Sequence, residues 1–132
     1  MNTTEIREVF EAQLELSEGL PALIWPNTNA PAGLKTKVEL TFVGSRRRMA
    51  GLNLREHTGS LTAIVCFPLG QGEDPAVAVA ETLADAFPAG FRGAAGGTQL
   101  EVTETPTVQD GYPTDTNWRV PVTIPYRATP RP

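Results

Sequence analysis

The chain has 132 residues, which suits one domain, and its 40% hydrophobic and 7% aromatic content supports a modest packed core. A net charge of −4, from 15 acidic and 11 basic residues, argues against a general nucleic-acid binder, which normally carries a basic surplus. The single cysteine excludes an intramolecular disulfide, and the sequence contains no run of 18 apolar residues that would cross a membrane.

Two segments show the apolar spacing of amphipathic helices. The first covers about residues 4–17, where acidic residues surround an apolar stripe. The second covers residues 73–87 and carries Pro75 in its first turn, where the missing N–H costs no hydrogen bond. Because the second stripe is rich in alanine, we expect this helix to pack close against a sheet.

The other apolar segments alternate as strands do. We expect strands at residues 22–25, 34–43, 61–67 and 100–102, and the third of these is apolar on both faces. Between the second and third lies a polar, basic, glycine-punctuated stretch, residues 44–60, which we interpret as a loop between strands. Residues Met49 to Leu54 are compatible with part of a strand, but the sequence does not reveal the register of that strand.

The last strand has the clearest alternation in the chain. Trp118, Val120, Val122, Ile124 and Tyr126 share one face, and Arg119, Pro121, Thr123, Pro125 and Arg127 share the other. Two prolines on one strand cannot donate ladder hydrogen bonds, which predicts that this strand lies at an edge of the sheet.

Runs of strands without intervening helices predict an α+β fold. We expect a mainly antiparallel sheet of about five or six strands, with two helices packed on one face. We expect a single domain over residues 1–127 and a disordered tail over residues 128–132.

A search for reactive groups yields no constellation that would support catalysis, so we expect no enzyme, metal or cofactor. Zinc needs about four close ligands, and the chain has one cysteine and one histidine. His57 lies in the polar stretch without a nucleophile nearby, and Cys66 is best read as a small buried hydrophobe. The glycine-rich residues 90–97 lack the lysine of a phosphate-binding loop and read as a connector, and Asp110 and Asp115 read as turn formers.

Two features suggest contact surfaces instead. The basic patch formed by Arg46, Arg47, Arg48 and Arg55 is either a solvated loop or an arm that grips an acidic neighbouring subunit or DNA phosphates. The polar face of the last strand, with Arg119, Thr123 and Arg127, is either a surface for pairing with another subunit or one whose prolines block such pairing.

The order of several segments resembles the tail-terminator and minor-tail family of long-tailed bacteriophages and prophages. The chain opens with Thr-Thr-Glu-Ile-Arg-Glu-Val-Phe-Glu-Ala-Gln-Leu, followed by Leu-Pro-Ala-Leu-Ile-Trp-Pro-Asn at residues 20–27. His-Thr-Gly-Ser-Leu-Thr-Ala-Ile-Val (57–65) then enters a strand, and Gly-Gln-Gly precedes an alanine-rich helix that ends Ala-Phe-Pro. The last segment runs from Trp118 to Tyr126, so the resemblance covers nearly the whole chain. None of these segments contains a catalytic or metal-binding motif, so the resemblance rests on the order and lengths of the segments.

The resemblance implies a structural virion protein that forms a hexameric ring on the tail tube, stops tube polymerisation and presents a head-joining surface. Its implied partners are further copies of itself, the tail-tube protein and the head–tail connector, with duplex DNA passing through the lumen without specific binding. The implied location is the virion tail, with assembly in the bacterial host cytoplasm. A 132-residue globule is about 36 Å across, and six touching spheres leave a hole of that width.

Three other functions are compatible with the same residues. The first is a head-completion or neck protein of the same particle, which also forms rings. The second is a small non-viral α+β domain that binds a ligand or acts as an enzyme, although the sequence offers no convergent set of polar residues for a pocket. The third is a nucleic-acid-binding accessory factor that uses the basic patch.

Overall fold

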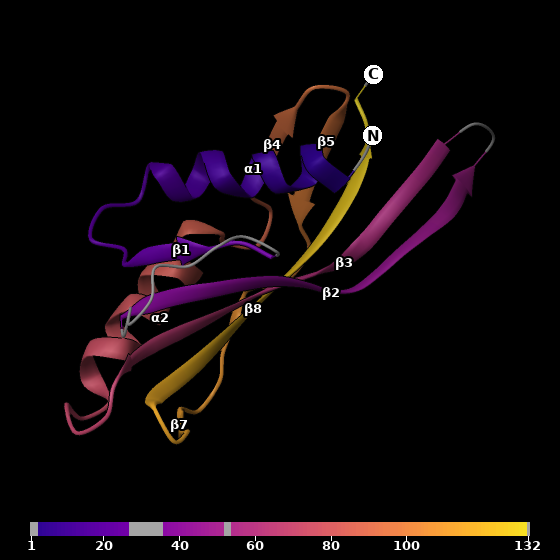
Figure 1. Cartoon of the computed structure of the whole chain (residues 1–132). Coiled ribbons are helices and arrows are strands. Elements are labelled where there is room, and N and C mark those ends of the chain that lie inside the picture. Colours follow the sequence, from indigo (N-terminus) through magenta and orange to yellow (C-terminus); the bar gives the residue numbers. More distant parts are fainter. Residues whose placement is uncertain (1–2, 27–35, 52–53, 132) are drawn as a thin grey trace.

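A computed structural model describes residues 3–26, 36–51 and 54–131 (Figure 1). In chain order, the elements are α1 (Thr3–Glu15), β1 (Ala22–Ile24), β2 (Lys37–Gly51), β3 (Leu54–Pro68), α2 (Asp74–Ala86), β4 (Arg92–Ala95), β5 (Thr98–Val102), β6 (Thr107–Val108), β7 (Tyr112–Pro113) and β8 (Asn117–Pro130). The α+β class with two helices is confirmed. The sheet of the described residues has eight strands, more than the five or six expected.

Both helices form where the apolar spacing predicts them, and the predicted stripes are the buried ones. In α1 these residues are Ile6, Val9, Phe10 and Leu14, and in α2 they are Ala76, Ala80 and Leu83. The rings of Phe10 and Phe87, the latter just after α2, lie 5.2 Å apart between centroids. The two helices therefore share one core against one face of the sheet, as expected.

The sheet is antiparallel except at one edge. Its strand order is β1-β2-β3-β8-β5-β4, β1 runs parallel to β2, and β6 and β7 also pair with β8. Figure 1 shows β2, β3 and β8 as long twisted strands that cross the whole molecule, with α1 lying over one side. The alternating apolar residues of these strands form the floor of the core.

The basic stretch at residues 44–60 is wrongly predicted as a loop. It is the outer half of a long hairpin, in which β2 and β3 stay paired from Lys37↔Cys66 to Gly51↔Leu54. A β-bulge between Val43 and Arg46 shifts the register by one residue, and Gly44 there has a φ of 69°. This half of the hairpin is mostly polar in sequence and shows no apolar alternation, so its strands could not be recognised from the pattern.

The position of the last strand is also wrongly predicted, because β8 lies inside the sheet. It pairs with β3 over residues 117–128 on one side and with β5, β6 and β7 in turn on the other. The carbonyls of Pro121 and Pro125 accept hydrogen bonds from Gln109 N at 2.9 Å and Thr103 N at 3.1 Å. The backbones of both prolines thus face the side where β8 pairs with three short strands. On that side their carbonyls accept hydrogen bonds, and no N–H donor is needed at these two positions.

Residues 128–130, which were expected to belong to a disordered tail, continue β8 to Pro130. Ala128 is fully buried, and Gln99 and Thr98 of β5 pair with Thr129 and Pro130. The N–H of Arg131 donates to the carbonyl of Gly97 at 2.8 Å. Pairing with β5 therefore orders this segment although its sequence has no alternation of its own.

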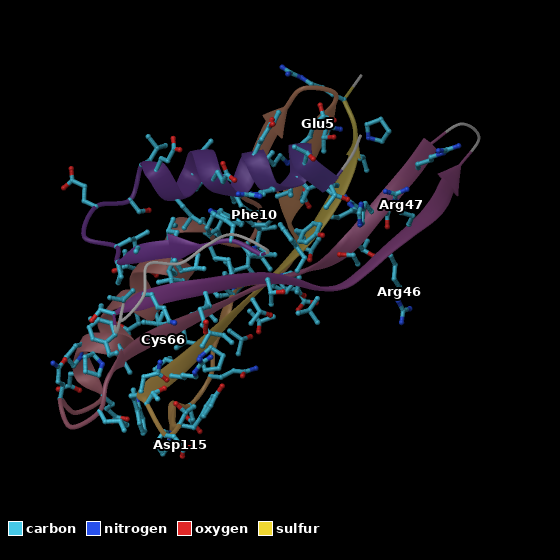
Figure 2. The ribbon with its side chains drawn as sticks, viewed as in Figure 1. Glu5, Phe10, Arg46, Arg47, Cys66 and Asp115 are labelled. Atoms are coloured by element: carbon cyan, nitrogen blue, oxygen red, sulfur yellow. The ribbon has the colours of Figure 1, made fainter. Side chains whose placement is uncertain are left out.

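An aromatic cluster occupies the centre of the core. The Phe10 ring, which Figure 2 shows between α1 and the sheet, lies 5.6 Å from Tyr126 and 6.1 Å from Phe42 between centroids. Phe10 therefore joins α1 to β2 and β8, while its contact with Phe87 joins it to the end of α2. Such aromatic pairs contribute beyond the area that they bury.

We expect Phe10→Ala to lower the free energy of unfolding by about 3–5 kcal/mol, because it leaves a cavity where four elements meet. Leu16→Ala is the matched control just past the end of α1, since Leu16 is 78% exposed, and should change stability by less than about 0.5 kcal/mol. Urea unfolding of both variants measures the difference. Equal midpoints would contradict the central place of Phe10.

Candidate interaction surface

The sheet face opposite the helices, called the outer face from here on, is polar along its strands. Cross-strand register arranges its side chains in three rows. The ionic row is Lys37, Cys66 and Arg119; the threonine row is Thr41, Thr62, Thr123 and Thr107; the arginine row is Arg46, Thr58, Arg127, Glu101 and Arg92. Neither helix packs on this face.

The ionic row is held together by Glu39. Its carboxylate lies 2.9 Å from a guanidinium nitrogen of Arg119 and 3.8 Å from the Lys37 ammonium. The Nε of Arg119 also donates to the Asn117 side chain at 3.1 Å. These contacts fix Arg119 within its own domain, and its side chain is only 24% exposed. The Arg119 guanidinium is therefore held in place by residues of its own domain.

The threonine row crosses four strands. Thr41, Thr62, Thr123 and Thr107 are direct cross-strand neighbours on β2, β3, β8 and β6. Thr62 and Thr123, at the centre, are half-buried. Their hydroxyl groups make this part of the outer face able to form hydrogen bonds.

The arginine row spans five strands and gathers the most charge. Glu101 accepts from Arg92 Nε at 3.0 Å and lies 3.9 Å from the Arg127 guanidinium. The side chains of Arg92 and Arg127 are nevertheless 81% and 47% exposed. A shallow hollow of about 510 Å³ opens here, lined also by Gln99, Thr129 and Arg131.

The predicted basic patch is divided between the two sides of the hairpin. Arg46 lies on the outer face beside Thr58, whereas Arg47 lies opposite His57 on the other side (Figure 2). Arg55 is exposed and pairs with Met49 on that other side. Arg48 pairs with Glu56 in the backbone register, and its side chain lies outside the described residues.

The structure thus brings Arg46 and Arg127 into one row and places Arg119 and Thr123 in the other two. Sequence reasoning missed Arg92 and Arg131, which line the same hollow as Arg127. Both residues belong to this surface because β4, β5 and β8 are neighbours in the sheet. The local sequence does not predict that pairing.

His57 is not the loop histidine that the sequence predicted. Its side chain is buried toward the core, next to Tyr126 at 6.5 Å between centroids, and Nδ1 has no hydrogen-bond partner among the described residues. Burial, assisted by the positive charge of Arg47, lowers the pKa of His57. The residue is therefore held neutral as part of the core's rim.

Cys66 is buried in β3, as predicted. Burial raises the pKa of the Cys66 thiol to about 11, with Glu39 nearby adding to the shift and Arg119 opposing it. A thiol with so high a pKa is a poor nucleophile, because the thiolate is the reactive form.

The glycine-rich segment forms the β4–β5 hairpin and not the loose connector that was expected. The carboxylate of Glu5, in the first turn of α1, accepts from Gly97 N at 2.7 Å and from the Thr98 hydroxyl at 3.0 Å. At the neighbouring Gly96, a Cβ atom would lie 1.7 Å from the same carboxylate. This turn therefore holds an anion that the chain itself supplies.

The remaining candidates show no converging groups. Asp110 and Asp115 are exposed around β7, as befits turn residues. Among residues 3–26, 36–51 and 54–131, no three His, Cys, Asp or Glu side chains come together as metal ligands do. Neither helix in this part of the chain is long and apolar enough to span a membrane.

Comparison with known proteins places the chain among the structural proteins of phage tails. The family described as phage tail terminator protein matches residues 5–126, and the chain belongs to that family. A solved structure described only by a sequence identifier aligns with 97% of this chain and 96% of its own, at 25% identity and a TM-score of 0.73. No curated protein matches. The recognition made from segment order is confirmed.

We expect Cys66 in the folded protein to react with a thiol reagent at least about 100-fold more slowly than in urea, because burial suppresses its thiolate. The release of a chromophore from a disulfide reagent near pH 8 measures both rates. Rapid reaction under native conditions, with the fold intact by circular dichroism, would contradict the buried position.

We also expect acid to destabilise the fold through His57. Its folded-state pKa lies below the unfolded value of 6.5, so the unfolded chain binds a proton first as the pH falls. Stability is therefore full above about pH 6.5 and declines as the pH falls from there through the folded-state pKa.

The non-titrating variant His57→Gln should lose less stability than the parent between about pH 7.5 and 5.5. Urea unfolding at the two pH values gives the comparison. An identical loss in parent and variant would show that His57 does not titrate differently on unfolding.

Proposed function

We propose that this protein is the terminator of a phage tail: six copies close into a ring on the last ring of the tail tube, stop its polymerisation and present the surface to which the head connector binds. The observation that carries the proposal is the match to the tail terminator family over residues 5–126. This family is one of structural proteins, which agrees with the expectation that the chain is not an enzyme.

The charge of the chain supports a ring through which DNA moves. A net charge of −4 gives phosphate no general reason to adhere, so duplex DNA can slide through the lumen. The arginines predicted as a contact patch are few enough to serve protein contacts without making the whole surface basic.

The fold also offers the two unlike surfaces that ring formation needs. A heterologous contact joins one surface of a subunit to a different surface of the next, and it closes into a ring when the rotation between subunits permits. Here the outer face of the sheet and the helical layer lie on opposite sides of the same domain. Arg46, Arg119, Thr123 and Arg127 of the outer face are the residues that we assign to contacts.

Purified protein should stop the growth of its cognate tail-tube protein when added at about one ring per tube end. Electron microscopy should show shorter tubes capped at one end, and mass measurement of detached caps should give six times the chain mass of 14.2 kDa. Bovine serum albumin at the same concentration is the control. Uncapped tubes of unchanged length would refute the terminator function.

A further inference from the structure

The arginine row is a concentrated positive feature on an acidic chain. Its five members contain three arginines and a single carboxylate, that of Glu101. Arg131 adds a further charge to the same hollow and has no ion pair among the described residues. Arg46, at the other end of the row, likewise has no carboxylate partner in the described part of the chain.

The exposed side of α2 is a matching negative feature, called the acidic stripe here. Asp74, Ala78, Glu81 and Asp85 follow each other at helical spacing, and all four are exposed. No basic residue occurs anywhere in α2, so nothing within the helix neutralises the stripe. Asp85 also sits in the last turn, where the helix dipole disfavours a carboxylate and favours a cation.

We propose that the arginine row of one subunit binds the acidic stripe of the next subunit, and that this contact orients the ring. The inference rests on the proposed ring-forming function and names the residues that build its subunit contact. Its occupant is a second copy of this chain, chosen because the two charge patterns are complementary.

The spacing of the charges agrees with this pairing. Arg46, Arg127 and Arg92 are each separated by two strand spacings, about 10 Å. Asp74 and Glu81 are seven residues apart on the helix, which is also about 10 Å. A helix laid across the strands along the row therefore brings Asp74 to Arg46 and Glu81 to Arg127, while Asp85, about 6 Å beyond Glu81, lies between Glu101 and Arg92.

The location of the two features gives the contact a direction. The row lies on the outer face near β4 and β5, while α2 packs on the other face against β3 and β8. Because one copy's row and its own stripe face opposite ways, they cannot meet within a subunit. They can meet only between copies, as a head-to-tail contact that passes from subunit to subunit.

The test reverses the charges on each side. In the row variant, Arg46→Glu and Arg127→Glu are combined; in the stripe variant, Asp74→Arg and Glu81→Arg are combined; the swap variant carries all four changes. Ring assembly is measured by mass photometry over a concentration series, for the free protein and on tail tubes. Circular dichroism and the melting temperature establish that each variant is folded.

Two controls separate the proposed contact from general charge effects. Arg47→Glu with Arg55→Glu makes the same change in net charge on the other side of the same hairpin. Glu8→Arg with Glu15→Arg makes the same change as the stripe variant on the exposed side of α1, where both carboxylates are exposed.

We expect the row and stripe variants each to raise the midpoint concentration for ring assembly at least about tenfold, since like charges then face each other. The swap variant should return it to within about threefold of the parent. Both control variants should stay near the parent value, and parent assembly should weaken as salt is raised.

Four results would overturn the inference. Rings that persist in the row and stripe variants would leave the terminator function standing but remove this contact. Rescue of the row variant by the α1 changes would assign the partner surface to α1. Loss of binding to a 30-base-pair duplex by the row variant, with its rings intact, would assign the row to DNA. A parent protein that forms no ring, alone or on tubes, would refute the proposed function itself.

Discussion

The pairing of β3 with β8 is the constraint on which the rest of the molecule depends. Residues 57–68 run antiparallel to residues 117–128 without a break in register. Because side chains alternate along a strand, this one register decides which residues of both strands enter the core and which reach the outer face. A slip by one residue would bury Arg119, Thr123 and Arg127 and expose Val120, Val122 and Ile124.

The same pairing separates the side chains of β3 and β8 into a core side and an outer side. On the core side, apolar residues of the sheet meet α1 and α2, and His57 is held neutral at the rim. On the outer side, Glu39 forms ion pairs with Lys37 and Arg119 beside Cys66, whose thiol is kept protonated chiefly by burial. The titratable groups of these residues thus stabilise the sheet or carry charge at its surface. Such a distribution is compatible with a protein that acts through contacts with other subunits.

The sequence predicts the helices and the alternation well, because both depend on local spacing. Residue types alone predict the buried face of β8 and the buried stripe of α1, which consists of Ile6, Val9, Phe10 and Leu14. Alternation does not reveal which strands are neighbours, so β8 is misplaced at an edge. Its prolines remove donors from one side only, and short strands that donate to its carbonyls fill that side.

The candidate surface could be predicted only in part for the same reason. Arg46, Arg119, Thr123 and Arg127 are recognisable as charged or polar residues without a place in a core. Their arrangement in rows, and the addition of Arg92, depend on pairing between segments far apart in the chain. The hairpin that carries Arg46 was missed because its outer half shows no apolar alternation, and the buried position of His57 was missed with it.

We propose that the outer face, left uncovered by the chain's own helices, is covered by a neighbouring subunit in the assembled tail. An electron cryomicroscopy map of the ring in place on its tail tube tests this most directly. We predict that Thr123 and Arg127 lose their solvent exposure to the next subunit. A ring in which the outer face borders solvent or the lumen would contradict the account.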